Sequence, residues 1–286
     1  GKDVTEPEIG SLCAEDKWIL SRLNNVIKEV TDNMEKYELG IAVQKIYDFL
    51  WDELCDWYIE IAKVRLWKAD EDPKAANEAL WTLRTALTQG LKLLHPFMPF
   101  ITEEIWQTLP HKGDALIVAE WPEYCQEHDF PEAELEMQRI MDVIRGVRNR
   151  RAEMNVPPSR KTNLYIATAE PNTFENGIAI LNKLAYATQI TIGQAFDIEG
   201  AVTIVTNDAK VYIPMDELVD KKAELARLNK ELETAKKQFA QVNGKLNNQG
   251  FLSKAPAQVV EGVKKDFETL TERIQLIESS ISALQS

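Results

Sequence analysis

The pattern of hydrophobic positions in residues 217–286 predicts an antiparallel helical hairpin. From Leu218 to Leu246, apolar side chains recur every seven residues, with others interleaved at the 3–4 spacing of a coiled-coil seam. The same spacing returns between residues 260 and 284. Between these arrays, Asn247-Asn248-Gln249-Gly250 breaks the first helix, and Pro256 fits only the opening turn of the second. A rod of this kind encloses no pocket, so we expect it to act by contact with a partner.

Helical periodicity also dominates the first half of the chain. Asp16 is placed to cap the first helix, whose apolar stripe ends before Gly40, and Pro73 opens the third. The apolar side of the second helix includes Tyr47 and Trp51. Long helices with short connections imply a bundle, which we assign to residues 1–156. The later helices are predicted over residues 41–67, 73–95, 100–109 and 132–154.

Beyond Pro157-Pro158 the hydrophobic period changes to two, which is typical of strands. We therefore expect a small α+β module over residues 157–216, followed by the hairpin over 217–286. The fold class is mainly α: a helical bundle, a small α+β module and an antiparallel coiled-coil hairpin. In the module, strands are predicted at residues 164–167, 189–192, 201–205 and 211–213, with a helix at 173–187.

The residues that usually carry catalysis or bind metals are sparse. The three cysteines are scattered without a CxxC pair, which favours reduced thiols in a cytoplasmic protein over disulfides or a cysteine zinc site. The three histidines lack metal-ligand spacing, and no nucleophile elbow or phosphate-cradling glycine loop occurs. Acidic pairs such as Asp52-Glu53 are expected on solvated helix faces. We expect no active site, metal, cofactor or membrane span in this chain.

The charge is unevenly distributed. The net charge is −13, and residues 1–136 carry 13 Lys/Arg against 28 Asp/Glu, whereas residues 137–170 carry 7 against 3. Arg145, Arg148 and Arg151 follow one another on a helix face, where guanidinium groups could grip a phosphate backbone. Pairing of these arginines with the upstream acids is an equal alternative.

The hairpin carries its own basic positions. With Leu218 at heptad position a, two lysines fall at position e and two at position f, making a stripe beside the seam. Solubilising the coiled coil is the simpler role for them, and binding of phosphates is the alternative. The four residues are Lys222 and Lys236 (e) and Lys230 and Lys237 (f).

Three segments resemble the anticodon-binding bundle of class I aminoacyl-tRNA synthetases. The segment 94–106 (LHPFMPFITEEIW) is similar to the most recognisable signature of that bundle, and 16–23 (DKWILSRL) resembles its entry. The segment 144–151 (IRGVRNRR), followed by 157–161 (PPSRK), resembles its continuation. The terminal hairpin with 251–256 (FLSKAP) near its turn resembles the valyl-tRNA synthetases, whereas the isoleucyl enzymes would have a cysteine-rich zinc module.

This resemblance implies that the bundle recognises the anticodon stem-loop of valine tRNA and that the hairpin contacts the outer corner of that tRNA. Trp18 would stack on a base, although a core role for Trp18 is the alternative, and Arg22 would contact phosphate or a base edge. Arg145, Arg148 and Arg151 would hold the backbone, and the hairpin lysines would meet phosphates.

The resemblance also carries expectations about the whole enzyme. Neither the His-x-Gly-His motif nor the Lys-Met-Ser-Lys-Ser loop of the family's catalytic domain occurs here. The chain would thus be the C-terminal portion of a valine–tRNA ligase, with ATP used by a catalytic domain outside it. We expect a monomer. A protein–protein scaffold or chaperone-like arm, or the tail of another class I synthetase, remain the alternatives.

Overall fold

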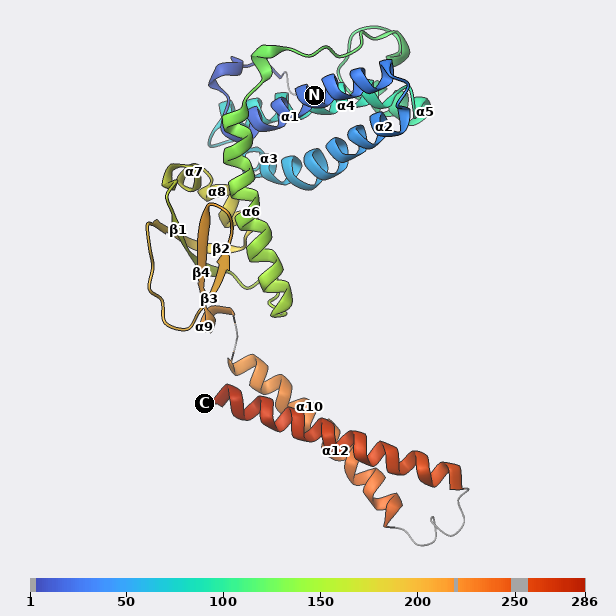
Figure 1. Ribbon diagram of the computed structural model, residues 1–286, viewed down its shortest axis with the longest axis vertical. Helices are drawn as coiled ribbons and strands as arrows, with labels where there is room; N and C mark the ends of the chain where they lie inside the picture. The colour runs from blue at the N-terminus through green and yellow to red at the C-terminus, as the bar shows by residue number, and fades with distance from the viewer. Residues whose placement is uncertain (1–3, 219–220, 248–256, 286) are drawn as a thin grey trace. The chain divides into compact units, whose positions relative to one another are not determined.

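The computed structural model describes residues 4–218, 221–247 and 257–285 of the chain. It confirms a mainly α-helical protein with a small four-stranded sheet (Figure 1). The chain forms two compact units, residues 1–214 and 215–286. The boundary predicted between residues 156 and 157 therefore lies inside the first unit, where the helical bundle and the α+β module pack together.

The helices of the bundle follow the predicted order. Asp72 caps α4 by accepting a hydrogen bond of 3.0 Å from the Ala75 amide, and Pro73 occupies the first turn, where its missing N–H costs nothing. Short 3-10 turns lie in the connections, at Ile9–Ser11, Leu116–Val118 and Gln126–His128. The bundle helices are α1 (Ala14–Glu35), α2 (Leu39–Asp48), α3 (Ile59–Leu66), α4 (Pro73–Leu94), α5 (Pro99–Gln107) and α6 (Pro131–Glu153).

The second predicted helix contains an irregular stretch that periodicity did not indicate. Between α2 and α3 the chain forms a π-helix, η2, from Phe49 to Tyr58. The i→i+5 bonds of a π-helix change the rotation per residue and so shift which residues face the core. Phe49, Leu54 and Tyr58 are buried, whereas Tyr47 and Trp51 are exposed. The expected position of Tyr47 and Trp51 on the apolar side is wrong.

Asp16 does not cap α1, contrary to the prediction. The helix begins at Ala14, and Asp16 lies within its first turn, fully buried. Its carboxylate accepts a hydrogen bond of 2.6 Å from the Tyr58 hydroxyl and one of 2.8 Å from Nη1 of Arg65, and it also contacts Nη2 of Arg65. This buried ion pair ties the start of α1 to η2 and α3.

The α+β module is a four-stranded sheet in the order β2-β1-β4-β3. Strands β1 and β2 are parallel, whereas β4 pairs antiparallel with both β1 and β3. The single predicted helix between β1 and β2 is two short helices, α7 (Pro171–Asn176) and α8 (Ile178–Leu184), which meet at Gly177. The strands are β1 (Thr162–Thr168), β2 (Ala187–Gly193), β3 (Ala201–Val205) and β4 (Ala209–Pro214).

Helix α6 connects the bundle to the module, packing against α1 and against β3 and β4 (Figure 1). Gly146 allows the close approach to β3, because a Cβ atom there would lie 2.7 Å from Cγ2 of Ile204. The apolar face of α6 is buried in these contacts, and of its arginines only Arg151 is buried with it among the residues that the structure describes. The buried residues include Met137, Ile140, Met141, Ile144 and Val147.

The second unit is the predicted hairpin. Helix α9 (Met215–Leu218) precedes α10 (Lys221–Leu246), and α10 packs along α12 (Ala257–Gln285). Leu228, Ala235 and Ile277 form its buried core. Glu231 pairs with Arg273, and Phe239 contacts Phe267 with 4.7 Å between ring centroids, so partners run in opposite directions along the two helices. The predicted break at residues 248–250 and Pro256 lie outside the described residues.

Candidate nucleic-acid interface

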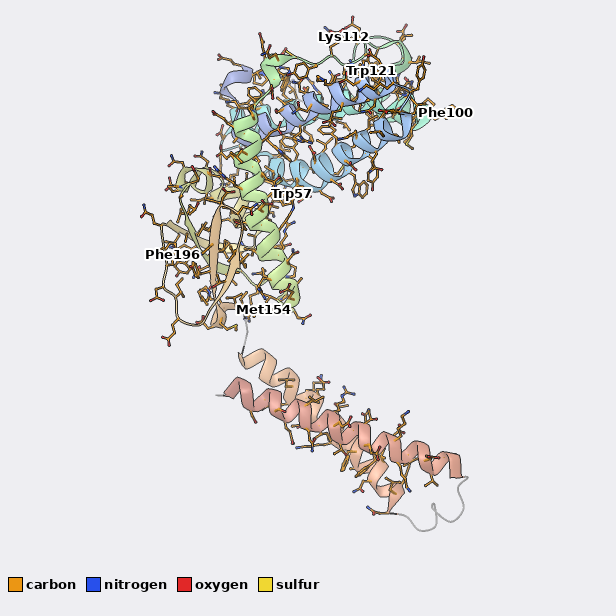
Figure 2. All side chains as sticks on the ribbon, in the orientation of Figure 1. Trp57, Phe100, Lys112, Trp121, Met154 and Phe196 are labelled. Atoms are coloured by element: carbon orange, nitrogen blue, oxygen red, sulfur yellow. The ribbon has the colours of Figure 1, made fainter. Side chains whose placement is uncertain are left out.

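Two of the predicted arginines lie together at the outer margin of α6. Arg145 is 48% exposed, and Nη1 lies 3.2 Å from the Asp142 carboxylate. Its guanidinium also lies 5.0 Å from the centre of the Trp57 ring. Trp57 belongs to η2 and is labelled in Figure 2. Arg148 contacts the same ring at 5.7 Å and donates a hydrogen bond of 2.8 Å to the Leu184 carbonyl. The shared indole holds both guanidinium groups in place, which reduces the entropy lost on binding a phosphate.

Arg151 is not part of that surface. It is 2% exposed, and its guanidinium donates to the carbonyls of Pro157 and Arg160 and to the Thr162 hydroxyl. Burial lowers the pKa of Arg151. The side chain fastens the connection between α6 and β1, so the predicted contact with phosphate does not fit its position.

Other arginines of residues 137–170 pair with carboxylates, which is the alternative to phosphate binding that the sequence allowed. Arg139 lies 3.9 Å from Glu170 and 3.5 Å from Asp208. Arg150 lies 3.1 Å from Glu153. The cluster is therefore divided: part of it supports the fold, and the exposed Arg145 with the half-buried Arg148 forms the part that shares the Trp57 ring.

Trp18 is 3% exposed, and it packs in the bundle core. A base stacks on an aromatic side chain only if one face of the ring is open to it. Its burial supports the core role that an amphipathic helix allows, and the predicted stacking role does not fit this position.

Arg22 lies beside Trp18 in a cavity of about 420 Å³ that Arg145 also lines. Nη2 and Nε of Arg22 lie 2.9 and 3.0 Å from the two Glu53 carboxylate oxygens, and Nη1 lies 3.5 Å from Glu134. The hydrogen bond to Glu53 raises the pKa of Arg22, while burial raises the pKa of Glu53 against the lowering effect of Arg22. Two carboxylates thus compensate the Arg22 charge, which disfavours contact with a phosphate. Glu53 was expected on a solvated face, and this pairing corrects that expectation.

An exposed aromatic pair on the adjacent helix was missed by the sequence reasoning. Tyr47 and Trp51 are 55% and 56% exposed, and their rings are nearly parallel, with 9° between planes and 6.3 Å between centroids. They follow one another by four residues, so they occupy the same helix face. Their polar neighbours Gln44 and Asp48 were the available signal that this face points to solvent.

The hairpin lysines differ in their surroundings. Lys236 pairs with Glu278 across the seam at 2.8 Å. Lys230 and Lys237 are exposed, and neither forms an ion pair with any residue that the structure describes. Lys222 lies in α10, but its side chain is outside the described part. Two of the four predicted lysines thus present unpaired charge.

Neither a metal cluster nor a membrane-spanning helix occurs in the described parts of the chain. No three His, Cys, Asp or Glu side chains gather there as ligands would. None of the helices described combines enough length with enough apolar residues to cross a bilayer.

Comparison with known proteins assigns both units. Residues 16–166 match the family model described as the anticodon-binding domain of tRNA ligase. Residues 220–285 match the model described as the valyl tRNA synthetase tRNA binding arm. The first match covers the bundle and reaches β1, and the second covers α10 and α12.

Several relatives that align along most of this chain are valine–tRNA ligases. The chain is 44% identical over 274 residues to a valine–tRNA ligase of Clostridium acetobutylicum, covering 94% of this chain and 31% of that protein. For the valine–tRNA ligases of Oceanobacillus iheyensis and Bacillus subtilis, the identities are 40% and 38%, covering 96% and 93% of this chain and 32% and 31% of those proteins. The chain spans about a third of the length of these relatives. It belongs to the family of anticodon-binding domains of tRNA ligases.

Proposed function

We propose that this chain is the tRNA-binding region of a valine–tRNA ligase and that it binds valine tRNA. The observation that carries the proposal is that an anticodon-binding match and a valyl-type arm match occur in one chain, each on its own structural unit. In this arrangement the first unit holds the anticodon stem-loop and the hairpin holds the outer corner of the tRNA.

The enzyme as a whole would join valine to its tRNA in an ATP-dependent reaction. We assign no cofactor and no catalytic residue to this chain, and we place use of ATP outside it. The protein would act in the cytoplasm as a monomer. The chain's part in the reaction is then to select and orient the tRNA, so its mutants should first change binding rather than chemistry.

Within the first unit, Tyr47 and Trp51 are the better candidates for stacking on unpaired anticodon-loop bases. Their parallel, exposed rings offer the open faces that Trp18 lacks. Arg145 and Arg148, steadied by Trp57, would hold the phosphate backbone and position the loop without reading its sequence.

Replacing Trp51 by Ala should weaken binding of valine tRNA by about 1–3 kcal/mol, because a stacked base would lose its aromatic partner. Filter binding with purified tRNA measures this change. Trp51→Phe keeps an aromatic face and should recover most of the affinity. Trp67→Ala serves as the matched control, since Trp67 is also exposed but has the Lys183 ammonium over its ring at 4.2 Å. Equal losses in Trp51→Ala and Trp67→Ala would argue against stacking at Trp51.

Replacing Lys230 and Lys237 together by Gln should lower affinity for all tRNAs and reduce the slope of log affinity against log salt by about one for each lysine. The reason is that each phosphate contact releases bound counterions. The control is Lys236→Gln, whose charge is already compensated by Glu278. If the double variant shows the same slope of log affinity against log salt as the unaltered chain, these lysines do not contact phosphates and only solubilise the hairpin.

Filter binding with valine and isoleucine tRNAs tests the proposed function itself. We expect saturable binding at micromolar protein or below, with preference for valine tRNA. Preference for another tRNA would indicate a different class I synthetase. Absence of binding to any tRNA, together with a stable protein partner, would favour a scaffold.

A further inference from the structure

A second basic site lies in the bundle, away from the α6 arginines. A cavity of about 840 Å³ opens between α4 and the segment that connects α5 to α6. Its volume falls within the range of about 300–1,000 Å³ that small-molecule sites occupy. Arg84, Lys92 and Lys112 line it, against the single carboxylate of Glu120.

This concentration of positive charge is unusual for its surroundings. The first 136 residues carry more than twice as many acids as bases, yet residues 79–102 contain no Asp or Glu. Arg84, Thr88 and Lys92 follow one another every four residues, which places them on one face of α4. None of Arg84, Lys92 and Lys112 forms an ion pair with the residues that the structure describes. Three cations against one carboxylate, Glu120, leave a net positive cavity that favours an anion, and phosphate above all.

The same cavity has an aromatic wall. Trp106 is 2% exposed, and the His111 ring stacks on it with 3.7 Å between centroids and 28° between planes. His111 is held by a hydrogen bond of 2.8 Å between Nδ1 and the Leu109 carbonyl. His111 is only partly buried and covers Trp106, so a nucleic-acid base would stack on the imidazole and not on the enclosed indole.

Two buried polar atoms of residues lining this cavity lack partners. Nε1 of Trp106, a donor, and Oε1 of Gln89, an acceptor, form no hydrogen bond within the described residues. Buried polar groups in proteins are nearly always hydrogen-bonded, so an unsatisfied donor and acceptor in one cavity wall call for an explanation. A base edge, which carries both donors and acceptors, is complementary to such a pair.

We propose that this cavity binds a nucleotide, with its phosphate held by Arg84, Lys92 and Lys112 and its base on the His111 ring, which Trp106 supports from behind. The cations account for the phosphate, and the rings and unpaired polar atoms account for the base. The ligand is either a free mononucleotide or an unpaired nucleotide of an RNA, which share this chemistry. The site does not rest on the proposed function, because a free nucleotide satisfies it without any tRNA.

The adjoining cavity leaves room for the rest of such a ligand. It measures about 650 Å³ and shares Thr85, Gln89, Lys92 and Glu120 with the first. Trp121 belongs to this second cavity, and Figure 2 labels it and Lys112 at the same end of the bundle. Lys92 lines both cavities, so its charge can act on a ligand that extends from one into the other.

Nuclear magnetic resonance of the full chain tests the site through its indole N–H signals. There are seven tryptophans, and Trp106→Phe identifies the Trp106 signal. Titration with AMP, CMP, GMP and UMP to about 10 mM should move that signal saturably for at least one of them, with a dissociation constant of about 1 mM or lower. Lys92→Gln and Arg84→Gln should each weaken the binding about tenfold.

The matched control is Lys74→Gln, which removes the same charge from α4 at an 80% exposed position outside the cavity. It should leave the titration unchanged. Three results would overturn the site: a Trp106 signal that no nucleotide moves, inorganic phosphate that moves it with the same affinity, or Lys92→Gln binding as well as the unaltered chain. Unshifted signals elsewhere in the Gln variants verify that their fold is retained.

Binding of tRNA by the Arg84→Gln/Lys92→Gln double variant shows whether the ligand is a free mononucleotide or an unpaired nucleotide of an RNA. Weakened tRNA binding identifies an RNA nucleotide as the ligand, and unchanged tRNA binding identifies a free one. Failure of this site is distinguishable from failure of the proposed function. If the chain prefers valine tRNA but no nucleotide moves the Trp106 signal, the nucleotide site is rejected and the proposed function stands.

Discussion

Replacing Asp16 by Ala is expected to lower the free energy of unfolding of the first unit by about 3–5 kcal/mol. Asp16 is fully buried, and its carboxylate binds both the Arg65 guanidinium and the Tyr58 hydroxyl. Burial opposes the charge of Arg65, but the hydrogen bond and charge of Asp16 outweigh burial and raise the pKa of Arg65. An arginine side chain keeps its charge in proteins, so Arg65 remains charged when Asp16 is removed, and the cost is that of a buried cation left with only the Glu15 carboxylate at 3.5 Å.

Urea unfolding followed by tryptophan fluorescence measures this loss. All seven tryptophans lie between residues 18 and 121, so the signal follows the first unit and is insensitive to the hairpin. Asp16→Asn should be milder, because the amide oxygen can still accept from Tyr58. Asp32→Ala is the control on the same helix, since Asp32 forms only an exposed pair with Lys28. Equal unfolding midpoints for the Asp16→Ala and Asp32→Ala variants would rule out a structural role for the buried pair.

Replacing Arg151 by Met should cost about 2–4 kcal/mol of the same free energy. Met keeps the apolar stem but leaves the Pro157 and Arg160 carbonyls without their donor. Because these carbonyls belong to the connection between α6 and β1, we expect the α+β module to lose protection first. Hydrogen exchange of β1 amides provides that measurement.

Arg150→Met is the control for Arg151→Met. Arg150 is the neighbouring residue, but it is exposed, and its one ion pair with the residues that the structure describes is with Glu153. It should leave both unfolding and exchange nearly unchanged. If Arg151→Met proves as stable as Arg150→Met but binds tRNA less well, Arg151 contacts phosphate after all, and its hydrogen bonds in this structure are dispensable.

The sequence was sufficient for the elements that depend on regular periodicity. The hairpin was predictable because a heptad seam buries the same positions turn after turn, and α4 because Asp72 and Pro73 mark its start. The division at Pro157 stays a prediction, because prolines indicate only where a helix ends. They do not indicate what packs across that point, and Gly146 brings β3 against α6.

The candidate site was less predictable, because the roles of its residues depend on long-range partners. Arg145 and Arg151 lie on the same helix, yet Arg145 is half exposed beside Trp57 while Arg151 is enclosed by carbonyls from the following loop. Nothing in the local pattern separates them. Tyr47 and Trp51 were assigned to the core with the other large apolar residues, but Ala42, Ile46 and Phe49 occupy the buried face here, and the π-helix changes the register only from Phe49 onward.

The paired seam of the hairpin constrains how its length can change. Each layer of the seam takes one side chain from each arm, as Phe239 and Phe267 illustrate. Inserting seven residues into one arm alone would leave a heptad without partners, whereas insertion into both arms would move the tip outward by about 10 Å and keep every layer intact. The length of such an arm can therefore change without loss of packing only by whole heptads inserted in both helices, so it takes discrete values.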